Sequence, residues 1–216
     1  MTKQKQHQNL SQSRDGGYTI IESLVAMIVV SVLMIAIAPV MAFSVATRVQ
    51  ARRIELATQA ARTYIDALRT GAIVGPEPGP ENQRGFPRRF TGDLTQTNPP
   101  VPTAPNDDLY CVDLDGQGCI LRSNSSNRAF YVQGAWENTL TPPPADPTTT
   151  GYRLLVRVYR GDAAFGSLTG KQQSVANSGL GDPRAPLVVM QTEIPPTTQG
   201  GASAYRSLCA RTNGCR

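Results

Sequence analysis

The sequence predicts an α+β protein, in which one long N-terminal α-helix packs on a small antiparallel β-sheet head. Three observations support this fold class. The 25 residues from Ser23 to Thr47 carry no charge and are mostly Val, Ile, Leu, Met and Ala. A helical pattern then continues from Arg48 to about Thr70 without a breaker. Patterns typical of β-strands begin at Leu109.

The uncharged run is long enough to cross a membrane. As a helix, its length is about 37 Å at about 1.5 Å per residue, against about 30 Å of hydrocarbon. A single carboxylate, Glu22, lies just before the run. Because an acid at the mouth of a membrane helix is costly, Glu22 is a candidate functional residue.

The segment before this helix does not have the pattern of an ordinary secretory signal. Residues 1–17 are polar and Gln-rich, whereas a secretory signal is cut after its apolar region. A cut after Gly17 would instead leave the helix on the mature chain, with Tyr18 first and Glu22 fifth. The alternative is an uncut signal anchor over residues 1–47, with Glu22 at the headgroup level.

Gly17, Tyr18, Thr19 and Glu22, with Pro39 as the 22nd mature residue, resemble a type IV prepilin-type N-terminus. The resemblance implies that a membrane aspartyl prepilin peptidase cuts after Gly17 and methylates Tyr18. Glu22 would then pair with the Tyr18 amine of a neighbouring subunit, which makes it an assembly contact and not a catalyst. Pro39 is expected to kink or loosen the helix, as a flexible point during extraction from the bilayer or as an incidental bend.

Residues 17–71 resemble, more narrowly, the B-type hormogonium polysaccharide secretion pseudopilin of filamentous cyanobacteria. This resemblance implies a minor subunit of a type IV pilus-like assembly, with other pilins, a platform protein and a cytoplasmic ATPase as partners. It also implies a role in polysaccharide secretion and gliding motility. The alternatives are a minor pilin of an adhesive, twitching or DNA-uptake pilus, a type II secretion pseudopilin, or an uncut membrane-anchored binding module.

Charge gives the orientation only in part. The leader charges favour a cytoplasmic N-terminus, whereas three arginines after the span oppose it: Arg48, Arg52 and Arg53. We therefore take the orientation from the processing motif, which predicts a single-pass inner-membrane protein with a cytoplasmic N-terminus and its head outside the cytoplasm. The leader contributes +2 of the net charge of +5, and the remaining +3 is dispersed, so no nucleic-acid partner is expected.

Residues 48–74 are predicted to continue the helix as an amphipathic half. Ile54, Ala57, Ala61 and Leu68 recur at helical spacing, with Tyr64 or Ile65 between them. This stripe favours docking on a folded head over lipid binding by a basic juxtamembrane segment. Residues 75–108 are Pro-rich and are predicted to form an irregular loop. This loop contains a small basic cluster, Arg84, Arg88 and Arg89, which we interpret as solvated and not as a contact for an anionic polymer.

Residues 109–216 are predicted to form the extracytoplasmic β head with a C-terminal Cys loop. Strands are predicted at Leu109–Leu114, Ala129–Gly134, Tyr152–Arg160 and Pro186–Ile194. In the third, Arg153 and Arg157 lie on one face of an alternating pattern, which is typical of a half-buried antiparallel strand.

Four cysteines in an exported domain indicate disulfides. Three connectivities are possible, and we favour the local pairs Cys111–Cys119 and Cys209–Cys215, each worth roughly 2–3 kcal/mol. A zinc site is disfavoured by the spacing and by the lack of histidine. Asp113 and Asp115 are a weak calcium candidate, and a polar turn explains them better.

The sequence favours a structural protein over an enzyme. The only histidine is His7, in the leader, so the mature chain has no residues for a Ser/His/Asp or Cys/His arrangement. No Gly-rich phosphate loop follows a strand, and we expect no cofactor.

Overall fold

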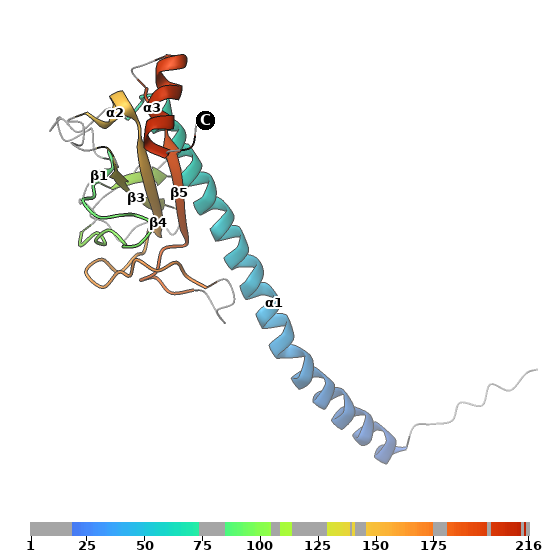
Figure 1. Cartoon of the computed structure of the whole chain (residues 1–216). Helices are drawn as coiled ribbons and strands as arrows, with labels where there is room; N and C mark the ends of the chain where they lie inside the picture. The colour runs from blue at the N-terminus through green and yellow to red at the C-terminus, as the bar shows by residue number, and fades with distance from the viewer. Residues whose placement is uncertain are drawn as a thin grey trace, which may run out of the picture. The chain divides into compact units, whose positions relative to one another are not determined.

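The computed structural model describes residues 19–73, 85–104, 109–113, 129–138, 140, 146–174, 181–197, 200–212 and 214 (Figure 1). They contain three helices and five strands: α1 (Ile20–Arg69), β1 (Arg88–Arg89), β2 (Tyr110–Asp113), β3 (Ala129–Glu137), α2 (Pro147–Thr150), β4 (Tyr152–Arg160), β5 (Val188–Ile194) and α3 (Ala202–Thr212). The chain divides into two compact units, Met1–Ser44 and Val45–Arg216. The boundary falls within α1, so each unit contains part of this helix.

The first unit contains the apolar part of α1. Its large apolar side chains are exposed, with exposed fractions from 51% at Val29 to 85% at Ile20. An 18-residue window of this helix has a mean hydropathy of 2.8, and none of it is buried. By length and composition the helix can cross a membrane, as the sequence predicts.

The second unit is built on a five-stranded sheet with the order β1-β3-β4-β5, in which β2 also pairs with β3. Because β4 occupies one edge of β3, the short strands β1 and β2 share the other edge. The pairs β2–β3, β3–β4 and β4–β5 are antiparallel, and β1–β3 is parallel, with Arg88 opposite Ala135. The α+β class is confirmed, whereas the expectation of a purely antiparallel sheet is wrong. The parallel pair involves only two residues, too few to leave a period-two pattern in the sequence.

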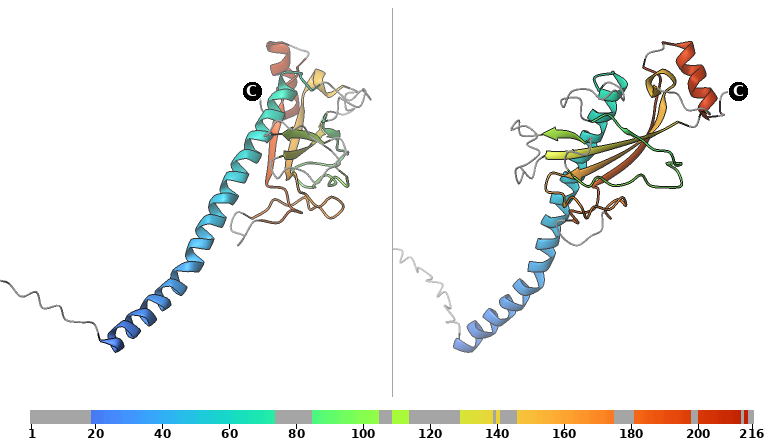
Figure 2. Two further views of the ribbon diagram at one scale, coloured as in Figure 1. Left: turned by 180° about the vertical axis from the view of Figure 1, so that it is seen from behind. Right: turned by 90° about the vertical axis from the view of Figure 1, so that its left-hand side faces the viewer.

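The second part of α1 packs on one face of this sheet, as Figure 2 shows. Its small residues Ala57, Ala60 and Ala61 are at most 2% exposed and allow a close approach of the helix to the sheet. The sheet contributes alternate residues of its strands: Phe130, Val132, Trp136, Tyr152, Leu154, Val156, Val158, Val188 and Ile194. The amphipathic stripe of residues 54–68 therefore docks on the head, as its spacing predicts.

Tyr64 is the polar contact at the centre of this interface. Its side chain is fully buried, and its hydroxyl donates a hydrogen bond to the Gly85 carbonyl at 2.6 Å. Burial, together with the neighbouring Tyr152 and Tyr110, raises the pKa of the Tyr64 hydroxyl well above its usual value. The chain at Gly85, which leads into β1, is thus tied to the helix.

The other face of the sheet is also covered, which the sequence does not predict. Segments 90–104 and 161–170 lie over it, and their apolar side chains pack on alternate residues of β3 and β4: Phe90, Leu94, Val101, Ala163, Phe165 and Leu168. The prediction that β4 is half-buried is therefore wrong, since seven of its nine residues are buried, with side chains on both faces, and Arg157 is fully buried. Likewise, part of the predicted irregular loop 75–108 forms β1 and this cover.

Two short helices complete the described head. Asp146 caps α2, because its carboxylate accepts a hydrogen bond from the Thr148 N–H at 2.8 Å, and Pro147 occupies the first turn. Helix α3 contains Cys209, so the prediction of a C-terminal Cys loop is wrong for residues 202–212. The sequence from Ala202 to Thr212 has few large apolar residues at helical spacing, so its periodicity does not indicate a helix.

Candidate functional site

The candidate site begins at the N-terminal end of α1, where Thr19 caps the helix. The Thr19 Oγ1 accepts a hydrogen bond from the Glu22 N–H at 3.3 Å, and its carbonyl accepts one from the Ser23 N–H at 3.2 Å. Thr-x-x-Glu immediately before an apolar run is a capping-box pattern. Thr19 is thus both a residue of the processing motif and the N-cap of α1, and the Thr-x-x-Glu pattern is a local signal for the second role.

Glu22 lies in the first turn of α1 and is exposed. Its carboxylate is placed where the partial positive charge of the helix N-terminus favours an anion. The next charged residue along α1 is Arg48, so Glu22 is the single carboxylate of the membrane-spanning part. Gly17 and Tyr18 lie outside the described residues, and the pairing of Glu22 with a Tyr18 amine stays a prediction.

Pro39 lies inside α1, and the helix continues on both sides of it. A proline at this position removes one hydrogen-bond donor from the helix. Its role as a flexible point stays a prediction.

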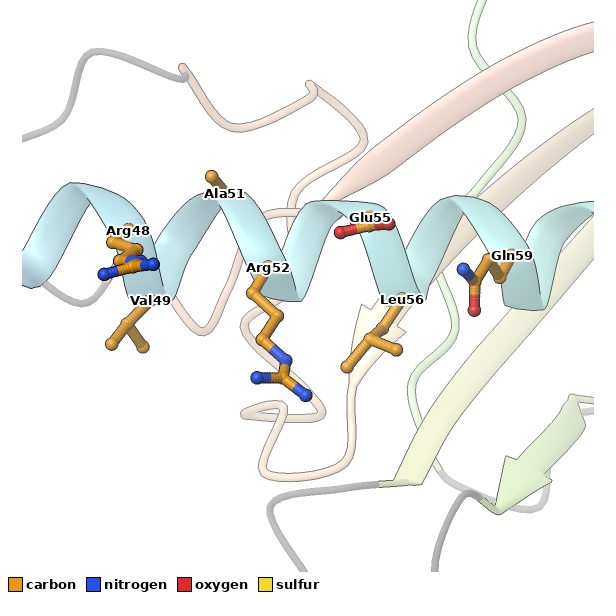
Figure 3. A pocket seen from close by; sticks show the side chains of 7 residues that line it. All are labelled: Arg48, Val49, Ala51, Arg52, Glu55, Leu56 and Gln59. Atoms are coloured by element: carbon orange, nitrogen blue, oxygen red, sulfur yellow. The ribbon is translucent and has the colours of Figure 1, made fainter.

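Beyond the apolar part, α1 presents a polar face that does not pack on the sheet. Arg48, Arg52, Glu55 and Gln59 recur along it, and they border a hollow of about 710 Å³. Figure 3 shows the side chains of Val49, Arg52 and Leu56 pointing to the same side of the helix. Every described residue that lines this hollow comes from α1, so it is a surface recess and not an enclosed ligand pocket.

The cysteine predictions are only partly covered by the described residues. Cys111 in β2 and Cys209 in α3 are both disulfide-bonded. Cys119 and Cys215 lie outside the described residues, so the two local pairs stay a prediction. Peptide mapping of the non-reduced protein would identify the pairing.

The residues that the structure describes provide no cluster suited to a metal ion. Among them, no three His, Cys, Asp or Glu side chains are grouped so as to hold a metal ion. Asp113 ends β2, whereas Asp115 and His7 lie outside the described residues. The weak calcium candidate therefore receives no support.

Comparison with known proteins identifies the N-terminal segment. Residues 12–38 match the family model of the prokaryotic N-terminal methylation motif. No curated protein and no solved structure matches the chain. The matched span includes Gly17, Tyr18, Glu22 and the whole of the apolar run before Pro39.

The motif and the capped apolar helix support a membrane-anchored, single-pass protein of the type IV pilin-like class, either a pilin or a pseudopilin. Proteins of this class have structural roles. The motif implies processing by a prepilin peptidase and assembly with other pilins in a membrane-associated system.

Proposed function

We propose that this chain is a minor pilin-like subunit, a pseudopilin, of a type IV pilus-like secretion and motility assembly. The observation that carries the proposal is the methylation motif at residues 12–38, followed by a helix whose only carboxylate in the apolar part is exposed in its first turn. In this mechanism the peptidase cuts after Gly17 and methylates the new amine of Tyr18. Before assembly, the mature subunit is anchored in the inner membrane by its N-terminal helix, with the head outside the cytoplasm.

Assembly follows from the cost of burying charge. In a bundle of apolar helices, Glu22 and the Tyr18 amine would each be expensive to bury alone. Pairing the carboxylate of one subunit with the amine of the next compensates both charges and sets the axial register of the helices. A platform protein and a cytoplasmic ATPase would supply the work that lifts the subunit from the bilayer.

The particular process is supported by the resemblance of residues 17–71 to the pseudopilin of hormogonium polysaccharide secretion. On this basis we assign the chain to polysaccharide secretion and gliding motility. A minor pilin of an adhesive, twitching or DNA-uptake pilus and a type II secretion pseudopilin share the same N-terminal chemistry. Deletion of the gene, with assays of surface polysaccharide, motility and surface pili, separates these roles.

Two measurements test the mechanism. Mass spectrometry of the protein from cells should show a chain that begins at methylated Tyr18; an intact leader would contradict the proposal and favour an uncut membrane-anchored binding module. Glu22→Ala should leave the cleavage intact and block incorporation into the assembly. Glu55→Ala is the matched control, because it removes an exposed carboxylate of the same helix beyond the membrane part. Normal assembly of Glu22→Ala would refute the pairing.

A further inference from the structure

The polar face of α1 begins with cations directly after the apolar run. The run ends at Thr47, Arg48 is the next residue, and Arg52 follows one turn later. Both arginine side chains are exposed, and both lie in the second compact unit. Among the residues that the structure describes, none forms an ion pair or a hydrogen bond with either guanidinium group. The two cations are thus available to a partner outside the chain.

The positions of these arginines along the helix match the depth of lipid phosphates. On each side of the hydrocarbon, the headgroup region of a bilayer is about 5–8 Å thick. At about 1.5 Å per residue, Arg48 lies about 2 Å and Arg52 about 8 Å beyond Thr47 along the helix axis. Because helical side chains point back toward the helix N-terminus, the long side chain of Arg52 extends toward the bilayer. Both guanidinium groups therefore fall within reach of the phosphate layer.

The carboxylates of this helix face lie farther from the apolar run. Glu55 lies about 12 Å and Asp66 about 28 Å beyond Thr47 along the axis. Glu55 is thus outside a headgroup layer of this thickness, although it borders the same hollow as the two arginines. Between Thr47 and Glu55 the sequence contains cations and no acid. The charge of this segment is therefore complementary to an anionic layer at the end of the membrane span.

An apolar side chain accompanies the cations. Figure 3 shows Val49 and Arg52 on the same side of α1, and Val49 is 38% exposed. A phospholipid has surfaces for both, because its phosphate accepts hydrogen bonds from a guanidinium group and its glycerol and upper acyl chain contact an apolar side chain. A free phosphate would use the arginines alone. The combination favours a lipid over a soluble anion.

We propose that Arg48 and Arg52 bind the phosphate groups of anionic phospholipids at the bilayer surface where α1 leaves the membrane. A different face of the helix packs on the sheet, so lipid binding and head packing do not compete. A second copy of the chain in parallel register would instead place the same cations opposite these arginines. The inference requires the membrane anchor, and it is independent of the cut after Gly17 and of the pairing of Glu22.

The test is native mass spectrometry of the full-length protein in neutral detergent micelles, which counts bound lipids and reports the oligomeric state. The probes are dioleoyl phosphatidylglycerol, dioleoyl phosphatidylcholine and glycerol phosphate without acyl chains. The test variant is Arg48→Gln/Arg52→Gln. The matched control is Arg62→Gln/Arg184→Gln, which removes the same charge at two exposed positions farther along the chain. The leader cations are common to all three proteins, and circular dichroism with Trp136 fluorescence establishes that both variants are folded.

We expect the native protein to bind phosphatidylglycerol more tightly than phosphatidylcholine or glycerol phosphate. Each arginine near a bilayer surface strengthens the binding of anionic lipid about fivefold, so the test variant should weaken phosphatidylglycerol binding about 25-fold. The control should change it less than about twofold, because its arginines lie beyond the headgroup layer.

Three results would overturn the proposal. The first is a loss smaller than about fivefold in the test variant, or an equal loss in the control. The second is equal binding of phosphatidylglycerol and either other probe by the native protein. The third is a test variant that dissociates dimers of the native protein while its lipid binding is unchanged, which would assign this face to a second copy of the chain.

Discussion

The contact between helix and sheet at Gly134 offers the sharpest test of the packing. A Cβ added to Gly134 would overlap the Tyr64 hydroxyl and lie 2.7 Å from Pro87 Cβ and 3.1 Å from Pro87 Cα. Neither neighbour can move freely, because Tyr64 is fully buried and hydrogen-bonded to Gly85, and Pro87 is buried next to β1. Gly134→Ala should therefore destabilise the head.

Two effects determine the size of the loss. Overpacking a core by one methyl group costs about 1–3 kcal/mol. If Tyr64 is displaced, its buried hydrogen bond to the Gly85 carbonyl is lost as well, at about 1–2 kcal/mol. We therefore expect the free energy of unfolding to fall by about 2–4 kcal/mol.

The single tryptophan of the chain provides the assay. Trp136 is 3% exposed in β3, two residues from the substitution, so its fluorescence reports unfolding of the head in urea. Gly200→Ala is the matched control, because a Cβ there meets no atom within 4 Å. In a Tyr64→Phe background the cost of Gly134→Ala should fall by about 1–2 kcal/mol, since the clashing hydroxyl is gone while Pro87 remains.

Equal stability of Gly134→Ala and Gly200→Ala would refute this account of the interface. A cost of Gly134→Ala that is unchanged by Tyr64→Phe would show that Pro87 alone limits the space. This double-mutant cycle thus separates the contribution of Tyr64 to the loss of stability from that of Pro87.

Three further predictions concern the charged and titratable groups of the head, each measured by urea unfolding with Trp136 fluorescence. Arg153→Met should lower stability by about 2–3 kcal/mol, because it leaves the buried Glu137 carboxylate without its cation; a loss below about 0.5 kcal/mol would contradict this. Arg157→Met should lower stability by about 1–2 kcal/mol, because the buried Pro99 carbonyl loses its hydrogen bond from Arg157 at 2.9 Å; an unchanged free energy of unfolding would contradict this. Burial raises the pKa of Tyr64 in the folded state, so the folded protein retains its proton where the unfolded chain loses it. The Tyr64 contribution to stability should hold up to about pH 10 and then fall by up to about 1.4 kcal/mol per pH unit, so that the loss of stability above this pH is smaller in Tyr64→Phe.

Features that depend on neighbouring residues were predictable. The membrane-spanning run, the docking stripe of α1 and the positions of β2, β3, β4 and β5 follow from charge, spacing and alternation within a few residues. The methylation motif is similarly local, because it lies within the contiguous residues 12–38. For Glu22 the sequence indicated a functional carboxylate, and the structure adds the capped first turn on which it lies.

The cover on the second face of the sheet was not predictable. Its hydrogen bonds join residues far apart in the sequence, such as Arg157 and Pro99, separated by 58 residues, and Glu137 and Leu94, separated by 43. An arginine in an alternating pattern is normally exposed, so no local signal shows that a distant segment will cover Arg157.

The sequence alone thus determined the anchoring helix, the processing motif and most strands, because each is set by chemistry within one turn or one strand. Only the tertiary structure decided the parallel pairing of β1, the close contact of Tyr64 with Gly134, and the burial of Arg157 beneath the segment that contains Pro99. These features arise where segments distant in the chain meet, and the free energy that selects them belongs to the packed core as a whole.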